Sequence, residues 1–505
     1  MSAIFTTFLD SLTIFSQPML FVYMILGMYF GMYAGAMPGI STTMAITLMV
    51  SVTYNVDTYP ALAALMGCYV AGVYGGSRSA VLLNIPGTPA SVATAFDGYP
   101  LAKQGKAAKA LGVTAIQSVI GGIIGAVALF LAAPIITKFA LLFAARDYFL
   151  LALMGILLLA TLSGGGMAKC AFGGFLGLLI GCIGMDGSTA VHRFTFGNIR
   201  LMSGISTVAV MLGMFGISEV LMQTRDMSKV EVIKQDVSRI IPTFKDAFGY
   251  MKVTLESSAI GTIVGALPGT GGAIAALIAY DRAKKSVKNP EVPFGEGAIE
   301  GLCASESANN AAVGGALIPM LTLGIPGDQV TALLLASLTM HGVVTGPTLM
   351  TNGSGLFGVI VGLCLIANIL LLPISLTGIK SFAKIVEVPK EILLPIIIVL
   401  SVVGSYSATR NLFDVYFMIG CGLLGYFMKL HGFSTGTVAL GIILSSLIEL
   451  NFRKAWVISK GNIVHFFQQI VTHPLSLVLF LLVILMVVRP GKIINKMKQK
   501  KHNQV

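Results

Sequence analysis

Long apolar runs, free of Asp, Glu, Lys and Arg, follow one another along most of this chain. They are Ala110–Thr137, Tyr148–Ala168, Cys170–Met185, Leu201–Ser218, Ile392–Thr409, Val415–Met428, Phe433–Ile448 and Phe466–Val488, together with the stretch Gln329–Ile379. Because a helix needs about 20 residues to cross the apolar core of a bilayer, the runs predict an all-α polytopic membrane protein with about 12 membrane helices.

Composition excludes the soluble classes of protein. Hydrophobic residues make up 55% of the 505 residues and charged residues 11%, which is less than half of the ~25% typical of soluble domains. So few charges cannot cover a water-facing surface, and a soluble enzyme, a nucleic-acid-binding protein and a disordered protein are excluded despite the net charge of +12. The six cysteines form no Cys-x-x-Cys pair, so neither a metal site nor a disulfide framework is indicated.

Basic residues gather in a few short loops, which orient the chain because such loops stay on the cytoplasmic side. The clusters are Lys103–Lys109, Arg225–Lys252, Arg282–Lys288, Lys380–Lys390 and the tail after Arg489. We expect a cytoplasmic C-terminus and an N-terminus on the outer side, where Asp10 is accompanied by no basic residue. The four basic residues that fall outside on this count are Lys138, Arg146, Arg453 and Lys454.

Two apolar segments are broken at their centres by a Pro-Gly pair. Met19–Tyr54 has Pro38-Gly39 and Thr254–Tyr280 has Pro268-Gly269. Proline interrupts a helix, and each segment lies between two ends predicted to be on one side of the membrane. We therefore expect each segment to return to its own side, the first outside and the second inside.

The two broken segments belong to an internal repeat. Their Pro-Gly pairs are 230 residues apart, and a second pair, Pro86-Gly87 and Pro326-Gly327, follows at an offset of 240. The copies run in opposite directions relative to the charged loops, so the pattern predicts two inverted-topology repeats. The alternative is that each Pro-Gly pair marks an ordinary kink or loop end. The predicted division is residues 1–225 for the first repeat, 226–252 for a cytoplasmic linker or interfacial helix, 253–488 for the second repeat and 489–505 for a basic cytoplasmic tail.

Broken helices at membrane depth can form a binding site. Their free N–H groups attract anions and their free carbonyl groups hold a cation such as Na⁺, while lipid can satisfy neither. The predicted substrate-binding residues are Pro38, Gly39, Ser41, Thr42, Arg78, Asn84, Pro86, Gly87, Thr88, Pro268, Gly269, Thr270, Asn309, Asn310, Pro326 and Gly327. The predicted Na⁺ ligands are Ser41, Asn84, Glu306, Asn310 and Asp328.

Four ionisable residues near the breaks have two interpretations each. Arg78 suits a carboxylate substrate through its planar guanidinium, or forms an internal ion pair with Glu306 or another acid. Glu306 holds a cation, or only caps a helix or pairs with a base. Asp97 is a functional candidate or a cytoplasmic loop residue, and we expect the loop. Asp328, directly after a Pro-Gly pair, is a functional candidate or a helix N-cap.

Two motifs, one of ATP-driven pumps and one of metalloproteases, do not occur in the sequence. It contains no Gly-x-x-x-x-Gly-Lys-Ser/Thr phosphate loop and no His-Glu-x-x-His. We therefore predict no catalytic residue, no enzyme activity and no cofactor beyond a coupling cation.

Five segments together resemble one family. They are Gly35–Ser41, Tyr74–Ala90, Asp97–Ala107, Ala266–Gly272 and Glu306–Gly327. They look like the large membrane (permease) subunit, of TctA type, of the tripartite tricarboxylate transporters. The resemblance extends over nearly the whole chain, including its length.

The resemblance implies a permease of the bacterial inner membrane that works with a small membrane subunit and a periplasmic substrate-binding protein. Family substrates are mostly carboxylates, such as citrate and other di- or tricarboxylates, and a Na⁺ or H⁺ gradient is thought to drive uptake.

The function we expect is secondary uptake of a carboxylate by alternating access around the Pro-Gly breaks, with an elevator-like motion by analogy. The alternative is a stand-alone Na⁺ or H⁺ symporter for another small solute, without a binding protein. A channel or scaffold is a third class, and a pore lined by rings of like residues is not visible in so asymmetric a chain.

Overall fold

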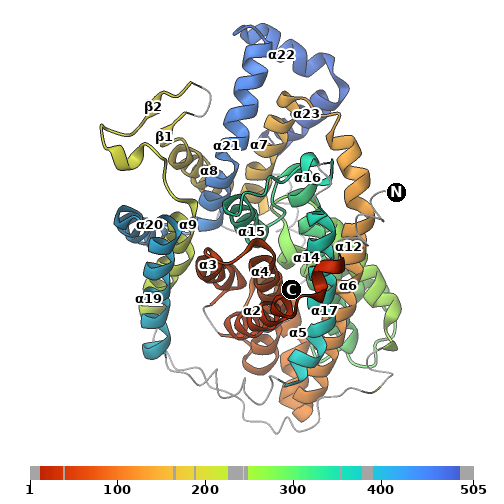
Figure 1. Cartoon of the computed structure of the whole chain (residues 1–505). Coiled ribbons are helices and arrows are strands. Elements are labelled where there is room, and N and C mark those ends of the chain that lie inside the picture. Colours follow the sequence, from red (N-terminus) through yellow and green to blue (C-terminus); the bar gives the residue numbers. More distant parts are fainter. Residues whose placement is uncertain are drawn as a thin grey trace. The chain divides into compact units, whose positions relative to one another are not determined.

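The computed structural model describes residues 12–37, 40–162, 166–186, 189–225, 243, 248–351, 355–377 and 390–488, and most of these residues are helical (Figure 1). Contacts divide the chain into two compact units, Met1–Lys138 with Val208–Tyr426, and Phe139–Thr207 with Phe427–Val505. Pro38, Gly39, Lys380, Lys384, most of the predicted linker 226–252 and the predicted tail 489–505 lie outside the described residues. The predicted domain division is a separate one and stays a prediction.

The first unit contains all four Pro-Gly segments of the two predicted repeats, whereas residues 139–207 of the first repeat and 427–488 of the second belong to the other unit. Its elements are η1 (Leu12–Ser16), α2 (Pro18–Ala36), α3 (Thr42–Thr53), α4 (Thr58–Leu83), η2 (Pro89–Ser91), α5 (Val92–Leu101), η3 (Ala102–Lys106), α6 (Ala107–Ala140), α9 (Thr207–Met211), η5 (Leu212–Ile217), α10 (Ser218–Arg225), α12 (Met251–Gly265), α13 (Gly271–Ser286), α14 (Ile299–Leu323), α15 (Gln329–Met340), α16 (Pro347–Thr351), α17 (Leu356–Thr377), α19 (Lys390–Thr409) and α20 (Leu412–Leu430), with α6 and α20 ending just beyond it.

The second unit is smaller. Its elements are α7 (Ala145–Leu162), α8 (Met167–Gly181), β1 (Gly184–Met185), β2 (His192–Arg193), η4 (Ile199–Leu201), α21 (Thr435–Ile458), α22 (Ile463–Thr472) and α23 (Pro474–Val488). Strands β1 and β2 pair antiparallel as a short hairpin. Small residues join α8 to α21, because a Cβ added to Gly177 would lie 2.1 Å from the carbonyl oxygen of Val438.

The chain is a multi-pass membrane protein of the all-α class. Among the described residues, seven helices are long and apolar enough to cross a membrane, or eight if α22 and α23, which meet at 105°, form one bent span. Helices α4 and α14, of 26 and 25 residues, are almost entirely buried. The predicted total of about 12 crossings stays a prediction.

The same packing contact occurs once in each predicted repeat. A Cβ added to Gly75 on α4 would lie 2.4 Å from the carbonyl oxygen of Met32 on α2. A Cβ added to Gly315 on α14 would lie 2.4 Å from the carbonyl oxygen of Thr262 on α12. These partners are related by the sequence offsets of the Pro-Gly pairs, so α2 with α4 and α12 with α14 are matching helix pairs. Glycine at these positions lets the two backbones approach closely.

The ends of the two long helices match as well. Asn84 ends α4 in the left-handed conformation with φ of 55°, and Gly324, 240 residues later, ends α14 in the same conformation with φ of 72°. A Pro-Gly pair follows each end after one residue. The repeat is thus present in helix packing and in backbone conformation, and its opposite orientation in the bilayer stays a prediction.

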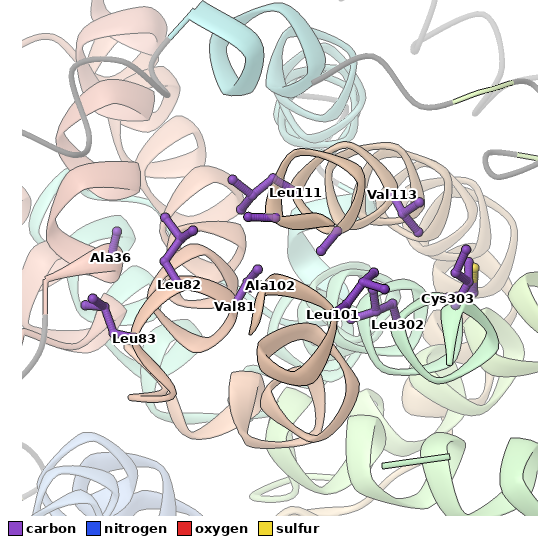
Figure 2. Close-up of a cluster of buried hydrophobic side chains, with 13 residues drawn as sticks. Ala36, Val81, Leu82, Leu83, Leu101, Ala102, Leu111, Val113, Leu302 and Cys303 are labelled. Atoms are coloured by element: carbon purple, nitrogen blue, oxygen red, sulfur yellow. The ribbon is translucent and has the colours of Figure 1, made fainter. Parts of the chain in front are cut away.

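The two copies interlock through the short elements that follow their breaks. Helix α3 of the first copy packs against α15 of the second, and α13 of the second packs against η2 and α5 of the first. A buried apolar cluster also joins both copies, with Ala36 on α2, Val81 on α4, Leu101 on α5, Leu111 on α6 and Leu302 on α14 (Figure 2). At the Pro326-Gly327 break both residues are buried in protein, as unpaired backbone groups at membrane depth require.

Candidate substrate and cation site

The two Pro-Gly breaks of the second copy meet each other. The backbone N–H of Gly269 donates to the carbonyl oxygen of Gly327 at 2.7 Å. Gly269 and Gly271 have φ of 82° and 63°, which glycine adopts without the strain that a Cβ brings. The Thr270 hydroxyl donates to the carbonyl of Leu267 at 2.9 Å and to the carbonyl of Val264 in the last turn of α12, and so ties the break to the end of that helix. Helix α13 therefore begins inside the protein, directly after the break.

Asn309 on α14 faces this beginning of α13. A Cβ added to Gly272, in the first turn of α13, would lie 2.5 Å from Asn309 Oδ1 and 3.6 Å from the Cβ of Ala90 in η2. Asn309 is 1% exposed, and neither atom of its amide has a hydrogen-bond partner in the part of the chain that the structure describes. Buried amides are nearly always satisfied, so an unsatisfied one beside a helix N-terminus is a candidate contact for a polar ligand.

The first copy has a counterpart at the beginning of α3. Ser41 caps this helix by accepting the backbone N–H of Met44 at 3.2 Å. The next residue, Thr42, is buried, and its hydroxyl has no hydrogen-bond partner among the described residues. Thr42 and Gly272 are related by the repeat offset of 230 residues. Both half-helices therefore begin beside a buried polar atom without a partner.

The Pro86-Gly87 break is packed tightly against the first helix pair. A Cβ added to Gly87 would lie 2.0 Å from the carbonyl oxygen of Gly35. The Thr88 and Ser91 hydroxyls share a hydrogen bond of 2.8 Å. Asn84, at the end of α4, is exposed, and Pro86 is half-buried.

Glu306 lies in the middle of α14 and is completely buried. Its Oε1 accepts a hydrogen bond from Ser77 on α4 at 2.6 Å and another from Thr94 on α5. Its Oε2 accepts from Ser118 on α6 at 2.8 Å. Among the described residues no cationic side chain lies within ion-pair distance, so the proposed pair with Arg78 is not formed. A carboxyl surrounded by hydroxyls from three other helices is a candidate site for a cation or a proton.

Arg78 lies one residue after Ser77 but points to another helix. Its guanidinium donates to the backbone carbonyl of Ser375 on α17 and lies 5.2 Å from the centroid of the Tyr74 ring. Arg78 is 1% exposed. Its predicted contact with substrate is untested, and in this conformation the side chain ties α4 to α17.

Asp328 has the capping role that its position after Pro-Gly predicts. It accepts the backbone N–H of Thr331 at 2.7 Å in a complete capping box at the start of α15. The Tyr69 hydroxyl on α4 donates to its second oxygen at 2.8 Å and so links the two copies. The prediction that Asp328 is also a Na⁺ ligand is untested.

Asp97 is not a loop residue, and that prediction is wrong. It lies on α5, is completely buried, and accepts backbone N–H groups of Gly295, Gly297 and Ala298 at 2.7–3.0 Å. The Tyr280 hydroxyl donates to it at 2.8 Å. The basic cluster that follows Asp97 suggested a loop, yet the aspartate satisfies the free backbone groups just before α14 and holds that segment in place.

The structure brings together some of the predicted site residues and separates others. Gly269 is hydrogen-bonded to Gly327, while Asn309 and Asn310 lie on the same helix as Glu306. Asn310 Nδ2 donates to the Glu306 carbonyl at 3.1 Å, and its Oδ1 has no partner within the described ranges. No hydrogen bond among the described residues joins Ser41, Asn84 or Asp328 to Glu306. Pro38 and Gly39 lie outside the described residues.

Sequence reasoning missed Ser77, Thr94 and Ser118, which hold Glu306, and Tyr69, which holds Asp328. Each comes from a helix far away in sequence, with separations of 188 to 259 residues. Their only local signal is a polar side chain within an apolar helix, which many residues of this chain share.

Comparison with known proteins settles the family. A sequence model of the tripartite tricarboxylate transporter TctA family matches residues 21–440. The chain belongs to this family. A relative from Agrobacterium vitis, described as an uncharacterized 52.8 kDa protein in the TAR-I ttuC' 3' region, is 36% identical over 434 residues, or 85% of each chain. An uncharacterized protein of the TAR-II ttuC' 3' region of the same organism is 38% identical over 43% of this chain and 87% of its own length. No solved structure matches.

Membership confirms the family resemblance and the expectation of a membrane transporter. A TctA protein is the permease component of a tripartite system, so the family name implies a small membrane subunit and a periplasmic binding protein as partners.

Proposed function

We propose that this chain imports a carboxylate that a periplasmic binding protein delivers, and that a cation gradient drives the import by alternating access. The observation that carries the proposal is the matched pair of half-helices, α3 and α13, each beginning inside the protein beside a buried polar atom without a partner.

The chemistry of these two helix starts favours an anion. The first N–H groups of a helix have no partner within the helix and carry the positive end of its dipole. A carboxylate accepts hydrogen bonds from such groups, and the amide of Asn309 adds one donor and one acceptor beside α13. A substrate with two or three carboxylates suits two such starts.

The contacts between the two copies connect a movement of one copy to the surroundings of the substrate. Because α3 packs on α15 and α13 packs on η2 and α5, a shift of one copy changes the surroundings of both half-helices. Glu306 lies one helical turn before Asn310, so a cation at this carboxyl lies close to the residues expected to hold the substrate.

Asn309→Asp tests the proposed substrate site. The substitution keeps the shape of the side chain and adds a negative charge beside α13, which repels a carboxylate strongly in a buried site. In proteoliposomes with the small subunit and the binding protein, we expect exchange of labelled carboxylate to fall by roughly a hundredfold or more.

Asn451→Asp is the matched control. Asn451 lies on α21 in the second unit, where its amide donates to the Leu447 carbonyl of its own helix. Exchange by this variant is expected to stay within about twofold of the unmodified protein, since Asn451 is half-buried, bonds only within its own helix and is not among the predicted site residues. Equal exchange by Asn309→Asp and Asn451→Asp would reject Asn309 as a substrate contact.

The alternative function, a stand-alone symporter for another solute, predicts a different requirement. Robust uptake by this chain in the absence of any binding protein would support it and would contradict delivery by a periplasmic partner.

A further inference from the structure

The buried Glu306 carboxyl has an environment suited to gaining and losing a proton. We infer that Glu306 carries the proton whose movement drives uptake, so that the coupling ion is H⁺ rather than Na⁺. The inference rests on the proposed function for its role in uptake, whereas occupancy of the site by a proton can be measured on its own.

The first argument is the charge balance. A carboxylate within a bilayer is costly unless a cation pairs with it, and no cationic side chain of the described residues lies within 4.0 Å of Glu306. The three hydroxyl donors offset part of that cost, but they carry no charge. The carboxyl therefore needs a positive ion from outside, and a proton is the smallest one.

The second argument is the space at the carboxyl. Ser77 Oγ and Ser118 Oγ lie 2.6 and 2.8 Å from the carboxyl oxygens, which are the distances of direct O–H···O hydrogen bonds. A Na⁺ ion has to lie between its oxygen ligands and would separate these atoms. A proton needs no such space.

The third argument is that hydroxyls suit both charge states. Each hydroxyl donates one hydrogen and also accepts, so all three donate when Glu306 is ionised. When Glu306 is protonated, its own O–H donates to one of them and that hydroxyl turns its hydrogen elsewhere. Thr94 has such a second neighbour in Ser305, whose Oγ lies 3.4 Å from Thr94 Oγ1. Only the O–H bond of the carboxyl forms and breaks, and the proton enters from one side of the membrane and leaves on the other.

Two buried charged groups on the helices packed around Glu306 are bound elsewhere. Arg78 on α4 donates to Ser375, and Asp97 on α5 is held by Tyr280 and backbone N–H groups. The remaining titratable side chains on α14 and the described helices packed around it are Tyr59, Cys68, Tyr69, Tyr74, Tyr99, Lys109, Lys138, Lys252, Glu256, Asp281, Arg282, Lys284, Lys285, Glu300 and Cys303.

Protonation of Glu306 is linked to the substrate site through two elements. Thr94 lies on α5, which continues from η2, and η2 packs against α13. On α14, the side-chain amide of Asn310 donates to the backbone carbonyl oxygen of Glu306. A change in the hydrogen bonds of the carboxyl thus alters the hold of α14 on α5, next to the start of α13.

The test uses the full chain with its small subunit, first unmodified and then as Glu306→Gln. Glutamine imitates the neutral carboxyl and cannot release a proton. We expect an acidic exterior to accelerate uptake by the unmodified protein by roughly tenfold or more, in the range of typical coupling energies. Glu306→Gln should lose this acceleration, so that any uptake it retains is the same with an acidic and a neutral exterior.

Two matched variants separate coupling from folding. Ser118→Ala removes one donor to the carboxyl and should shift the pH dependence of uptake. Ser307→Ala removes a hydroxyl on the same helix that donates to its own Cys303 carbonyl, and should leave the pH dependence unchanged.

Infrared difference spectroscopy of the purified protein provides a readout that does not need transport. A protonated-carboxyl band that titrates in the unmodified protein and is missing in Glu306→Gln supports the inference. Glu306 ionised at every pH, uptake driven by Na⁺ and insensitive to the pH gradient, or pH-driven accumulation by Glu306→Gln would each overturn it. If no carboxylate is transported at all, the proposed function fails, and the infrared band still decides whether Glu306 holds a proton.

Discussion

At the scale of single residues, buried polar side chains either hold the fold or offer a site, and their partners separate the two. The carboxylates of Asp97 and Asp328 accept hydrogen bonds from backbone N–H groups and tyrosine hydroxyls, and Asp328 also accepts from the Thr331 hydroxyl. The amide of Asn309, in the middle of α14 beside the start of α13, and the hydroxyl of Thr42, at the start of α3, have no partner among the described residues. Glu306 is bonded by neutral groups alone. These partners agree with a structural role for Asp97 and a capping role for Asp328, whereas binding by Asn309, Thr42 and Glu306, and Na⁺ ligation by Asp328, stay predictions.

Asp97→Ala tests the structural assignment. The change leaves three backbone N–H groups and the Tyr280 hydroxyl without their acceptor, which costs about 3 kcal/mol or more of local stability. We expect trypsin to cleave at the lysines of the adjoining segment, such as Lys288, much faster than in the unmodified protein. Asp281→Ala, which removes only an exposed i,i+4 pair with Lys285, is the control and should change the cleavage rate little. Equal rates for the two variants would refute the role of Asp97.

At the scale of elements, glycines determine how closely the paired helices approach. A Cβ at Gly31 would lie 2.2 Å from the carbonyl oxygen of Cys68, and a Cβ at Gly261 would lie 2.2 Å from that of Ala308. Gly31→Ala and Gly261→Ala should therefore each lower the free energy of unfolding of the detergent-solubilised protein by about 1–3 kcal/mol, which is measured as a lower unfolding temperature.

Gly420→Ala provides the control for these variants, because a Cβ added to Gly420 would have no described atom of another element within 4 Å. Its stability should be unchanged or slightly raised, since alanine favours a helix over glycine. A loss for Gly31→Ala without a similar loss for Gly261→Ala would contradict the matched packing of the two copies.

The sequence predicted elements better than the contacts between them. Uncharged runs such as Phe433–Ile448 mark helices because their apolar residues suit lipid and neighbouring helices, and the Pro-Gly pairs mark breaks because proline cannot continue a helix. Glu306 was recognisable as an ionisable residue near a break. Its partners were not, because contacts such as Ser77 with Glu306 join residues 229 positions apart and leave no periodic trace along the chain.

At the scale of the whole molecule, alternating access requires that the binding residues face each side of the membrane in turn. Cysteines in place of Ser41 and Asn310, in a background without the six native cysteines, report this through labelling by a thiol reagent that cannot cross the membrane. We expect substrate and the coupling cation to change the labelling of both positions from at least one side. Equal labelling from both sides, unaffected by either ligand, would indicate a channel instead.

The central claim is cation-coupled uptake of a carboxylate delivered by a periplasmic protein. The measurement that tests it most directly is uptake of labelled di- and tricarboxylates into proteoliposomes containing this chain and the small subunit. Uptake is compared with and without the binding protein, and with an inward gradient of H⁺, of Na⁺ or of neither. The account predicts accumulation only when the binding protein and a cation gradient are both present, with H⁺ as the effective ion. Accumulation without the binding protein, or equal passive flux without any gradient, would contradict it.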